Sequence, residues 1–120
     1  MRRLDVVDPV QHQSLTNDLG DTPIDMLMNN AGTYGQRDDS FGNTNERCRL
    51  ETFATNTIVP TKLSEALVIS IAASGRKVTE SISSMMGSIA DNSSGGHYVY
   101  PSSKAALNAA IKRQWCMSDT

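Results

Sequence analysis

Short apolar runs alternate along the chain with longer stretches in which apolar residues recur every three or four positions. The short runs are typical of strands, and the longer stretches are typical of helices. The predicted strands cover residues 4–7, 24–28 and 77–84. The predicted helices cover residues 9–19, 46–73 and 100–113. This alternation predicts an α/β fold with a parallel sheet and flanking helices.

Local signals set several boundaries of these elements. Asp8 can cap the first helix and Pro9 is tolerated in its first turn, while Gly20 readily takes the positive φ that ends a helix. Pro60 lies inside the longest helix, where it removes a backbone donor and should bend the helix modestly. Glu80 is unexpected in a strand buried on both faces, which leaves the register of that strand open.

Two polar loops interrupt the pattern. Residues 33–45 form a longer connection than most, and because such loops are often functional, this one is a candidate wall of a substrate entrance. Residues 87–96 are rich in Ser, Asn and Gly and predict a second loop before the last helix.

Composition narrows the class of protein. The 120 residues carry 11 basic and 13 acidic side chains, a net charge of −2, and the basic residues are scattered. We therefore expect a single domain that does not bind nucleic acid. No apolar run reaches the length of a membrane span, and acidic residues follow Leu4 where a signal peptide would be apolar. These features predict a cytoplasmic protein without membrane contact.

The two cysteines carry no metal-site signal. Cys48 and Cys116 lie far apart in the sequence, and neither has a second Cys or His at ligand spacing. We expect no metal site and no disulfide framework.

Tyr100 and Lys104 stand four residues apart on the last predicted helix and therefore share one face. An ammonium beside a phenol stabilises the phenolate, which allows the phenol to act as a general acid and base near neutral pH. A Tyr/Lys pair at this spacing also occurs by chance, so the pair alone is a weak signal.

Three other polar features coincide with strand ends or interrupt a helix. Ser84 ends the third predicted strand, where it can donate to a ligand oxygen, although a Ser-rich turn is the plainer alternative. Residues 29–32, Asn-Asn-Ala-Gly, follow the second strand and by themselves predict only a turn. Asn56 lies in an apolar stretch of the longest helix, where a poor helix former requires an explanation.

Read together, residues 29–32, Asn56, Ser84 and the pair Tyr100-x-x-x-Lys104 resemble the short-chain dehydrogenase/reductase family in order and spacing. The stretches most similar to its C-factor and sniffer-type carbonyl reductase branch are residues 86–96 and 103–108. The resemblance extends from about residue 4 to residue 112. It implies a Rossmann-like, doubly wound parallel sheet and an oxidoreductase that uses NAD or NADP on a small-molecule carbonyl or alcohol substrate.

The resemblance also implies catalytic roles. Tyr100 would protonate a carbonyl or deprotonate an alcohol, and Lys104 would promote its ionisation and hold the nicotinamide ribose hydroxyls. Ser84 would orient the substrate oxygen, and Asn56 would support a water molecule in the proton relay.

Other matched positions imply the cofactor cleft. Asn29, Ala31 and Gly32 would line its adenosine side. Asp5 and Val6 match the family's strand-end pair, which would bring the Asp5 carboxylate near the adenine amino group.

The sequence departs from the family in three ways. No Gly-rich turn between a strand and a helix precedes Leu4, although such a turn normally holds the cofactor pyrophosphate. The later strands of the family do not follow the Tyr/Lys helix. The strand at 77–84 is one residue long for the family and unusually polar, which a bulge would absorb. We therefore expect residues 1–120 to form one incomplete cofactor-binding domain, with NAD or NADP binding weakened or lost and little turnover by the chain alone.

The family's strand order raises a structural question. In a sheet ordered 3-2-1-4-5-6, residues 4–7 and 24–28 would be the third and fourth strands and would not be neighbours. Three outcomes remain open: the sheet closes up, another chain supplies strands, or the chain is a truncated product of little stability.

Two alternatives to an oxidoreductase fragment also remain open. One is a non-catalytic, C-factor-like signalling or interaction protein, and the other is an inactive truncated gene product. The helices at 46–73 and 100–113 form subunit contacts in many family members, and their Ala-rich faces allow homo-oligomerisation without requiring it.

Overall fold

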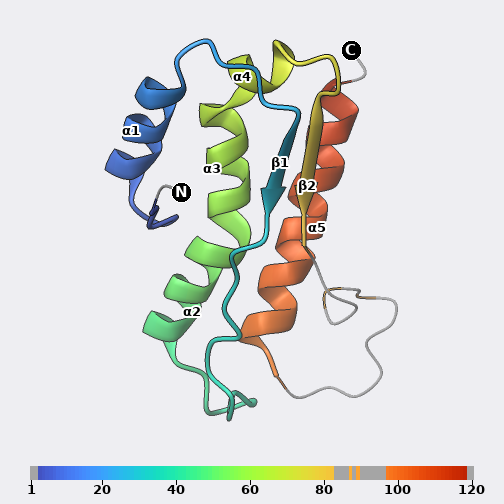
Figure 1. Cartoon of the computed structure of the whole chain (residues 1–120). Coiled ribbons are helices and arrows are strands. Elements are labelled where there is room, and N and C mark those ends of the chain that lie inside the picture. The colour runs from blue at the N-terminus through green and yellow to red at the C-terminus, as the bar shows by residue number, and fades with distance from the viewer. Residues whose placement is uncertain (1–2, 83–86, 88, 90–96, 119–120) are drawn as a thin grey trace.

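The computed structural model describes residues 3–82, 87, 89 and 97–118 as a small parallel sheet covered by helices (Figure 1). The helices are α1 (Pro9–Leu19), α2 (Glu46–Phe53), the π-helical turn η1 (Ala54–Ile58), α3 (Val59–Ala66), α4 (Val68–Ala72) and α5 (Val99–Ser118). The strands are β1 (Met26–Asn29) and β2 (Val78–Ser81). The predicted α/β fold is confirmed. Within the described ranges, no helix combines the length and apolar character that a membrane crossing requires.

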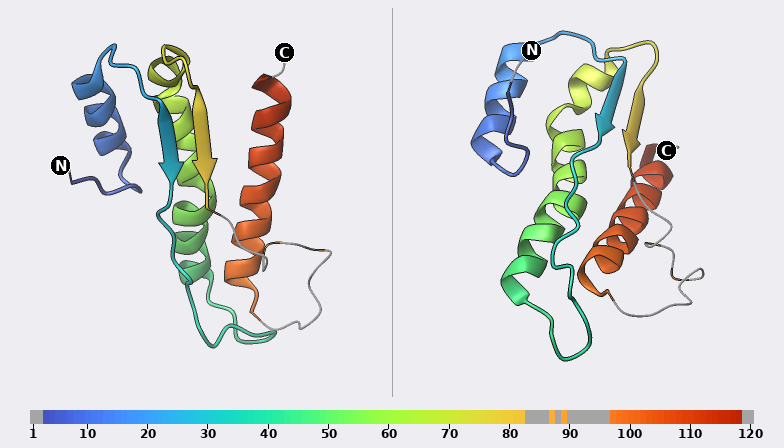
Figure 2. Two further views of the ribbon diagram at one scale, coloured as in Figure 1. Left: turned by 45° about the vertical axis from the view of Figure 1, so that its right-hand side comes forward. Right: turned by 60° about the horizontal axis from the view of Figure 1, so that its bottom comes forward.

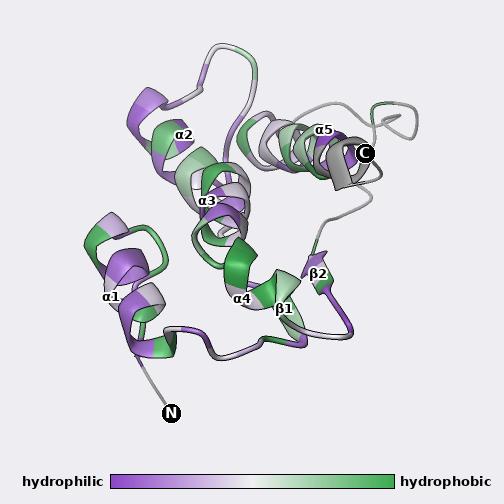
Figure 3. Ribbon diagram, turned by 90° about the horizontal axis from the view of Figure 1, so that it is seen from above, coloured by the Kyte–Doolittle hydropathy of each residue, from purple (hydrophilic) through white to green (hydrophobic). Residues whose placement is uncertain are grey.

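The strands β1 and β2 pair in parallel without a bulge, from Met26 opposite Val78 to Asn29 opposite Ser81. The ladder continues one step further, because the Ile82 N–H donates to the Asn29 carbonyl at 3.0 Å. Seen from above, α3 and α5 lie on the same side of both strands (Figure 3). Glu80 is exposed, so the predicted burial of this strand on both faces is wrong at that position.

The predicted strand at residues 4–7 does not form. Residues 6 and 7 make a turn instead, in which the Asp8 N–H donates to the Asp5 carbonyl at 3.2 Å. The Asp5 N–H donates to the Gln11 side chain at 2.6 Å. A strand requires a neighbour for its backbone groups, and no described strand lies beside this segment. The sheet therefore does not close up within the described residues.

The first helix has the predicted bounds. The Asp8 carboxylate accepts from the Val10 N–H at 3.0 Å, and Gly20 ends the helix with a φ of +53°. The helix α1 has no buried residue and lies beside α3 (Figure 2). Its contact includes Thr16, whose hydroxyl lies 3.4 Å from the Ala66 carbonyl.

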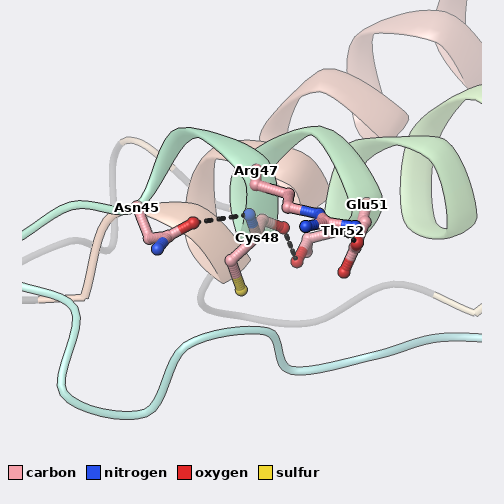
Figure 4. Close-up of polar contacts among 5 residues, drawn as sticks. All are labelled: Asn45, Arg47, Cys48, Glu51 and Thr52. Carbon is pink, nitrogen blue, oxygen red and sulfur yellow. Dashed lines mark hydrogen bonds and ion pairs between the residues drawn. The ribbon is translucent and has the colours of Figure 1, made fainter.

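The predicted helix at 46–73 is divided into α2, η1, α3 and α4. Asn45 caps its start by accepting from the Cys48 N–H at 2.9 Å (Figure 4). Pro60 does more than bend the helix, because its ring would clash with the carbonyl four residues earlier in a regular helix. The wider π turn η1 lies just before Pro60 and accommodates that ring. A second break falls at Leu67, where φ is −105° and ψ is 7°.

The apolar core is small and lies where α3, α4 and α5 meet the sheet. Its buried apolar residues are Val59, Leu63, Leu67, Ile71, Val99 and Leu107. Other large apolar side chains are exposed, including Leu50 and Ile58 on the helix predicted to form subunit contacts. Self-association through that helix stays a prediction.

We predict that Leu63→Ala lowers the free energy of unfolding by about 2–5 kcal/mol, because truncation of a buried leucine loses apolar contact and leaves a cavity. Leu63 is 6% exposed, whereas Ile69 is 75% exposed and provides the control. Ile69→Ala should change stability by no more than about 0.5 kcal/mol. Urea unfolding followed by circular dichroism measures both, and equal losses in the two variants would contradict this core assignment.

Candidate active site

Tyr100 and Lys104 lie on one face of α5, as their spacing predicts. The Lys104 Nζ atom is 5.8 Å from the centre of the Tyr100 ring. The same ammonium donates a hydrogen bond of 2.8 Å to the carbonyl of Ile82, immediately after β2. Lys104 is only 5% exposed, and burial lowers the pKa of its ammonium below the usual value. The phenol therefore has a fixed ammonium as its neighbour.

Glycine allows two segments to approach this ammonium closely. A Cβ atom at Gly87 would lie 2.8 Å from the backbone carbon and the Cβ of Lys104, so the chain after β2 lies directly against α5. A Cβ atom at Gly32 would lie 3.8 Å from Lys104 Nζ and 3.5 Å from Asn56 Oδ1. Gly32 thus brings the start of the loop after β1 to the same site.

Asn56 ties this loop to both long helices. Its side-chain oxygen accepts from the Thr33 N–H at 2.8 Å, and its Nδ2 donates to the Thr33 carbonyl at 2.8 Å. The same Nδ2 donates to the Ser103 hydroxyl on α5 at 3.0 Å. Asn56 is 1% exposed, so these bonds explain a polar residue inside the helix. Its role toward a relay water stays a prediction.

An aromatic side chain covers one face of Tyr100. The ring of Tyr34, from the loop after β1, stacks on Tyr100 with a centroid distance of 4.8 Å and an interplanar angle of 19°. His97 meets Tyr34 edge to face at 5.9 Å. Apart from the unusual length of the loop, no feature of the sequence predicted this contact.

The predicted adenosine-side residues divide between one groove and its surroundings. A groove of about 230 Å³ lies between β1, α3 and the N-terminal segment, and its lining includes Val6, Asn29 and Ala31. Gly32 lies beside Lys104 instead. Asp5 is exposed and does not line the groove, because its carboxylate accepts from the Val7 N–H within the local turn. Ser84 lies outside the described residues.

Polar groups at both ends of this site suit a nicotinamide dinucleotide. Lys104 Nζ makes one hydrogen bond among the described residues, so its other N–H groups can bind ribose hydroxyls. Asn29 is 8% exposed, and its Oδ1 has no partner among the described residues. Asn29 as a residue lines the groove, whereas this oxygen itself is buried.

Comparisons with known proteins identify relatives with a matching fold. No protein-family model matches the sequence. The C-signal protein of Myxococcus xanthus is 34% identical over 90 residues, which are 75% of this chain and 54% of that protein. The structure of carbonyl reductase Sniffer of D. melanogaster matches 94% of this chain and 51% of its own chain, with 30% identity and a TM-score of 0.87.

A third relative is a Burkholderia multivorans protein assigned to the short-chain dehydrogenases/reductases and solved with bound NADP. It is 31% identical with a TM-score of 0.80, and the match covers 92% of this chain and 47% of that protein. The chain spans about half the length of each of these relatives.

We predict that Gly87→Ala lowers the free energy of unfolding by about 1–3 kcal/mol, because its methyl group would overlap the backbone of α5. Gly75 is the matched control, since a Cβ atom there meets nothing within 4 Å and its φ is not positive. Gly75→Ala should stay within about 0.5 kcal/mol of the wild type. Urea unfolding measures both changes, and a Gly87→Ala variant as stable as the control would contradict the close packing at Lys104.

The lowered pKa of Lys104 predicts a pH dependence of stability. Between its folded pKa and the usual value of about 10.4, the unfolded chain binds more protons than the folded chain. The free energy of unfolding should therefore gain from Lys104 as pH rises through that window. Unfolding of the wild type and of Lys104→Met across this pH range isolates the effect. The difference, wild type minus variant, should rise toward alkaline pH, and a flat or falling difference would contradict burial of the charge.

Proposed function

Because the chain belongs to the short-chain dehydrogenase/reductase family, we propose that it carries the proton-transfer site of an NAD(P)-dependent carbonyl reductase. The chain spans about half the length of each relative named above. The observation that carries this proposal is the position of the buried Lys104 ammonium. It lies 5.8 Å from the centre of the Tyr100 ring and donates a hydrogen bond to the carbonyl of Ile82, the residue after β2. The NADP bound to the Burkholderia relative supports the choice of cofactor class.

In the proposed reaction, Tyr100 donates its phenolic proton to the carbonyl oxygen of the substrate. Lys104 stabilises the phenolate that remains, and the N–H groups that it does not use toward Ile82 would bind the ribose hydroxyls of the cofactor. Ser84 holds the substrate oxygen by a hydrogen bond. When bound, the reduced nicotinamide supplies the hydride that reaches the carbonyl carbon. The product is an alcohol, and alcohol oxidation follows the same steps in reverse.

Asn56 and Gly32 shape the site rather than transfer protons in this scheme. Asn56 holds both backbone groups of Thr33, and this fixes the loop that begins at Gly32 beside the Lys104 ammonium. The groove lined by Val6, Asn29 and Ala31 would hold the adenosine end of the cofactor.

The proposal predicts that turnover depends on the Tyr100 hydroxyl. The purified chain is mixed with NADPH and a panel of carbonyl compounds, and the loss of nicotinamide absorbance is followed. We expect turnover by the wild type to be slow. Tyr100→Phe should lower the rate by about a hundredfold or more, because it removes the general acid.

Tyr98→Phe is the matched control, because Tyr98 lies two residues earlier and its hydroxyl has no role in the scheme. Its rate should equal that of the wild type. Binding of reduced nicotinamide mononucleotide, followed by backbone chemical shifts near Lys104, provides an independent measurement of the nicotinamide end. The absence of both Tyr100-dependent turnover and such binding would contradict the proposal.

A second candidate is a signalling or interaction protein without catalysis, which the 34% identity to the C-signal protein of M. xanthus favours. In that case the Tyr100 and Lys104 pair is inherited but unused. The two candidates differ in the effect of Tyr100→Phe on the biological activity of the gene. An unchanged phenotype favours interaction, and a lost phenotype favours the enzyme.

A further inference from the structure

The loop after β1 grips the start of the helix that carries Tyr100. Asp39, in the middle of this loop, accepts with its Oδ2 from the Tyr98 N–H at 2.6 Å and also from the Val99 N–H. Asp39 is 3% exposed and Val99 is fully buried, so these bonds are shielded from water. A buried carboxylate thus caps α5 from a segment about 60 residues earlier in the chain.

The helix has no suitable cap of its own. The two residues before Val99, where the helix begins, are His97 and Tyr98, and neither type is favoured at an N-cap. The first N–H groups of a helix have no partner within the helix, and the helix dipole favours a negative charge at that end. Asp39 meets both requirements, and without it two N–H groups at the start of α5 lose their acceptor.

Hydrogen bonds hold the loop after β1 in its position. The Gln36 side chain joins the two arms of the loop: it donates to the Asn43 carbonyl at 2.9 Å and accepts from the Asn45 N–H at 3.0 Å. The start of the loop is fixed at Thr33 by the two bonds from Asn56. Asp39 therefore transmits the position of a fixed loop, and Gly35 in that loop approaches Thr52 so closely that a Cβ would lie 2.5 Å from the threonine hydroxyl.

The same loop contacts the phenol itself. Tyr100 directly follows Val99, whose N–H Asp39 binds, and the ring of Tyr34 stacks on the ring of Tyr100 at 4.8 Å. One loop thus determines both where α5 begins and which face of the phenol is covered. Lys104 is fixed independently by the Ile82 carbonyl.

We propose that Asp39 is a positioning residue for Tyr100, whose cap on the first turn of α5 sets the place of the phenol relative to Lys104. The consequence for catalysis rests on the proposed function, whereas the consequence for geometry does not. Loss of the cap frees the first turn, and Tyr100 then leaves the Tyr34 ring while Lys104 stays bound one turn later.

The test compares three variants of the full chain. Asp39→Ala removes the cap, and Asp39→Asn keeps an oxygen that can accept from both N–H groups. Asp38→Ala is the matched control, because Asp38 is exposed and its carboxylate accepts from Asn43 within the same loop. Amide hydrogen exchange at residues 98 and 99 and nuclear Overhauser contacts between the Tyr34 and Tyr100 rings report the position. The Tyr100-dependent rate with NADPH and a carbonyl substrate reports the consequence.

In Asp39→Ala we expect about tenfold faster exchange at residues 98 and 99 and loss of the Tyr34 to Tyr100 contacts. The kcat should fall by about a hundredfold with KM little changed, because a small displacement of the proton donor affects the reacting geometry. Asp39→Asn should recover most of each effect, and Asp38→Ala should change none.

Intact ring contacts in Asp39→Ala would overturn the positioning role. Lost contacts with an unchanged Tyr100-dependent kcat would also overturn it, because Asp39 would then be only a helix cap. If Asp39→Ala does not fold, Asp39→Asn decides the matter: wild-type contacts and kcat support the proposal, and lost contacts contradict it. A wild type that shows neither Tyr100-dependent turnover nor binding of reduced nicotinamide mononucleotide overturns the proposed function instead, while the ring contacts still decide the positioning.

Discussion

The bond from Lys104 to the Ile82 carbonyl joins the parts of this fold that carry its candidate chemistry. Ile82 follows β2 directly, and its own N–H binds the Asn29 carbonyl at the end of β1. One residue therefore links both strands to α5. Two paired strands are marginally stable by themselves, so their attachment to a helix matters for the sheet as well as for the site. The ammonium is buried to make this bond, and the lowered pKa of Lys104 reflects the cost.

A second attachment lies at the start of α5, between one and two turns before Lys104. Asn56 fixes the loop after β1, and Asp39 of that loop caps the helix. Because the apolar core is small, the hydrogen bonds of Asn56 and Asp39 are important for the orientation of the helices. Tyr100 lies between the two attachments, with Tyr34 against its ring. The geometry of the phenol is thus determined by polar contacts between segments far apart in the sequence.

Features with local causes could be predicted from the sequence, and features with distant causes could not. The helix α1 was bounded correctly by Asp8 and Gly20, because both residues act on their own neighbours. The prediction of a strand at residues 4–7 was wrong, because a strand needs a neighbouring strand. Backbone groups of this segment form hydrogen bonds within a local turn instead. The π turn was missed because the clash at Pro60 shows only that a regular helix is disturbed, not how it adapts.

The site divides in the same way. The Tyr100 and Lys104 pair follows from helical spacing. The sequence indicated only that Asn56 required an explanation, and the structure supplies one in its buried hydrogen bonds. Tyr34 and Asp39 carried no signal, since each acts through a contact that only the folded loop creates. The groove unites Val6 with Asn29 and Ala31, but the turn at residues 6 and 7 separates Asp5 from them. Family resemblance alone would have grouped all four.

The most direct measurement of the central claim is a titration of the Lys104 side chain by carbon NMR of labelled lysine, with Lys104→Arg to assign its signal. A buried ammonium bonded to Ile82 should titrate with a midpoint below the usual value of about 10.4 and show Overhauser contacts to the Tyr100 ring. A midpoint at or above that value, without contacts to the ring, would contradict the account.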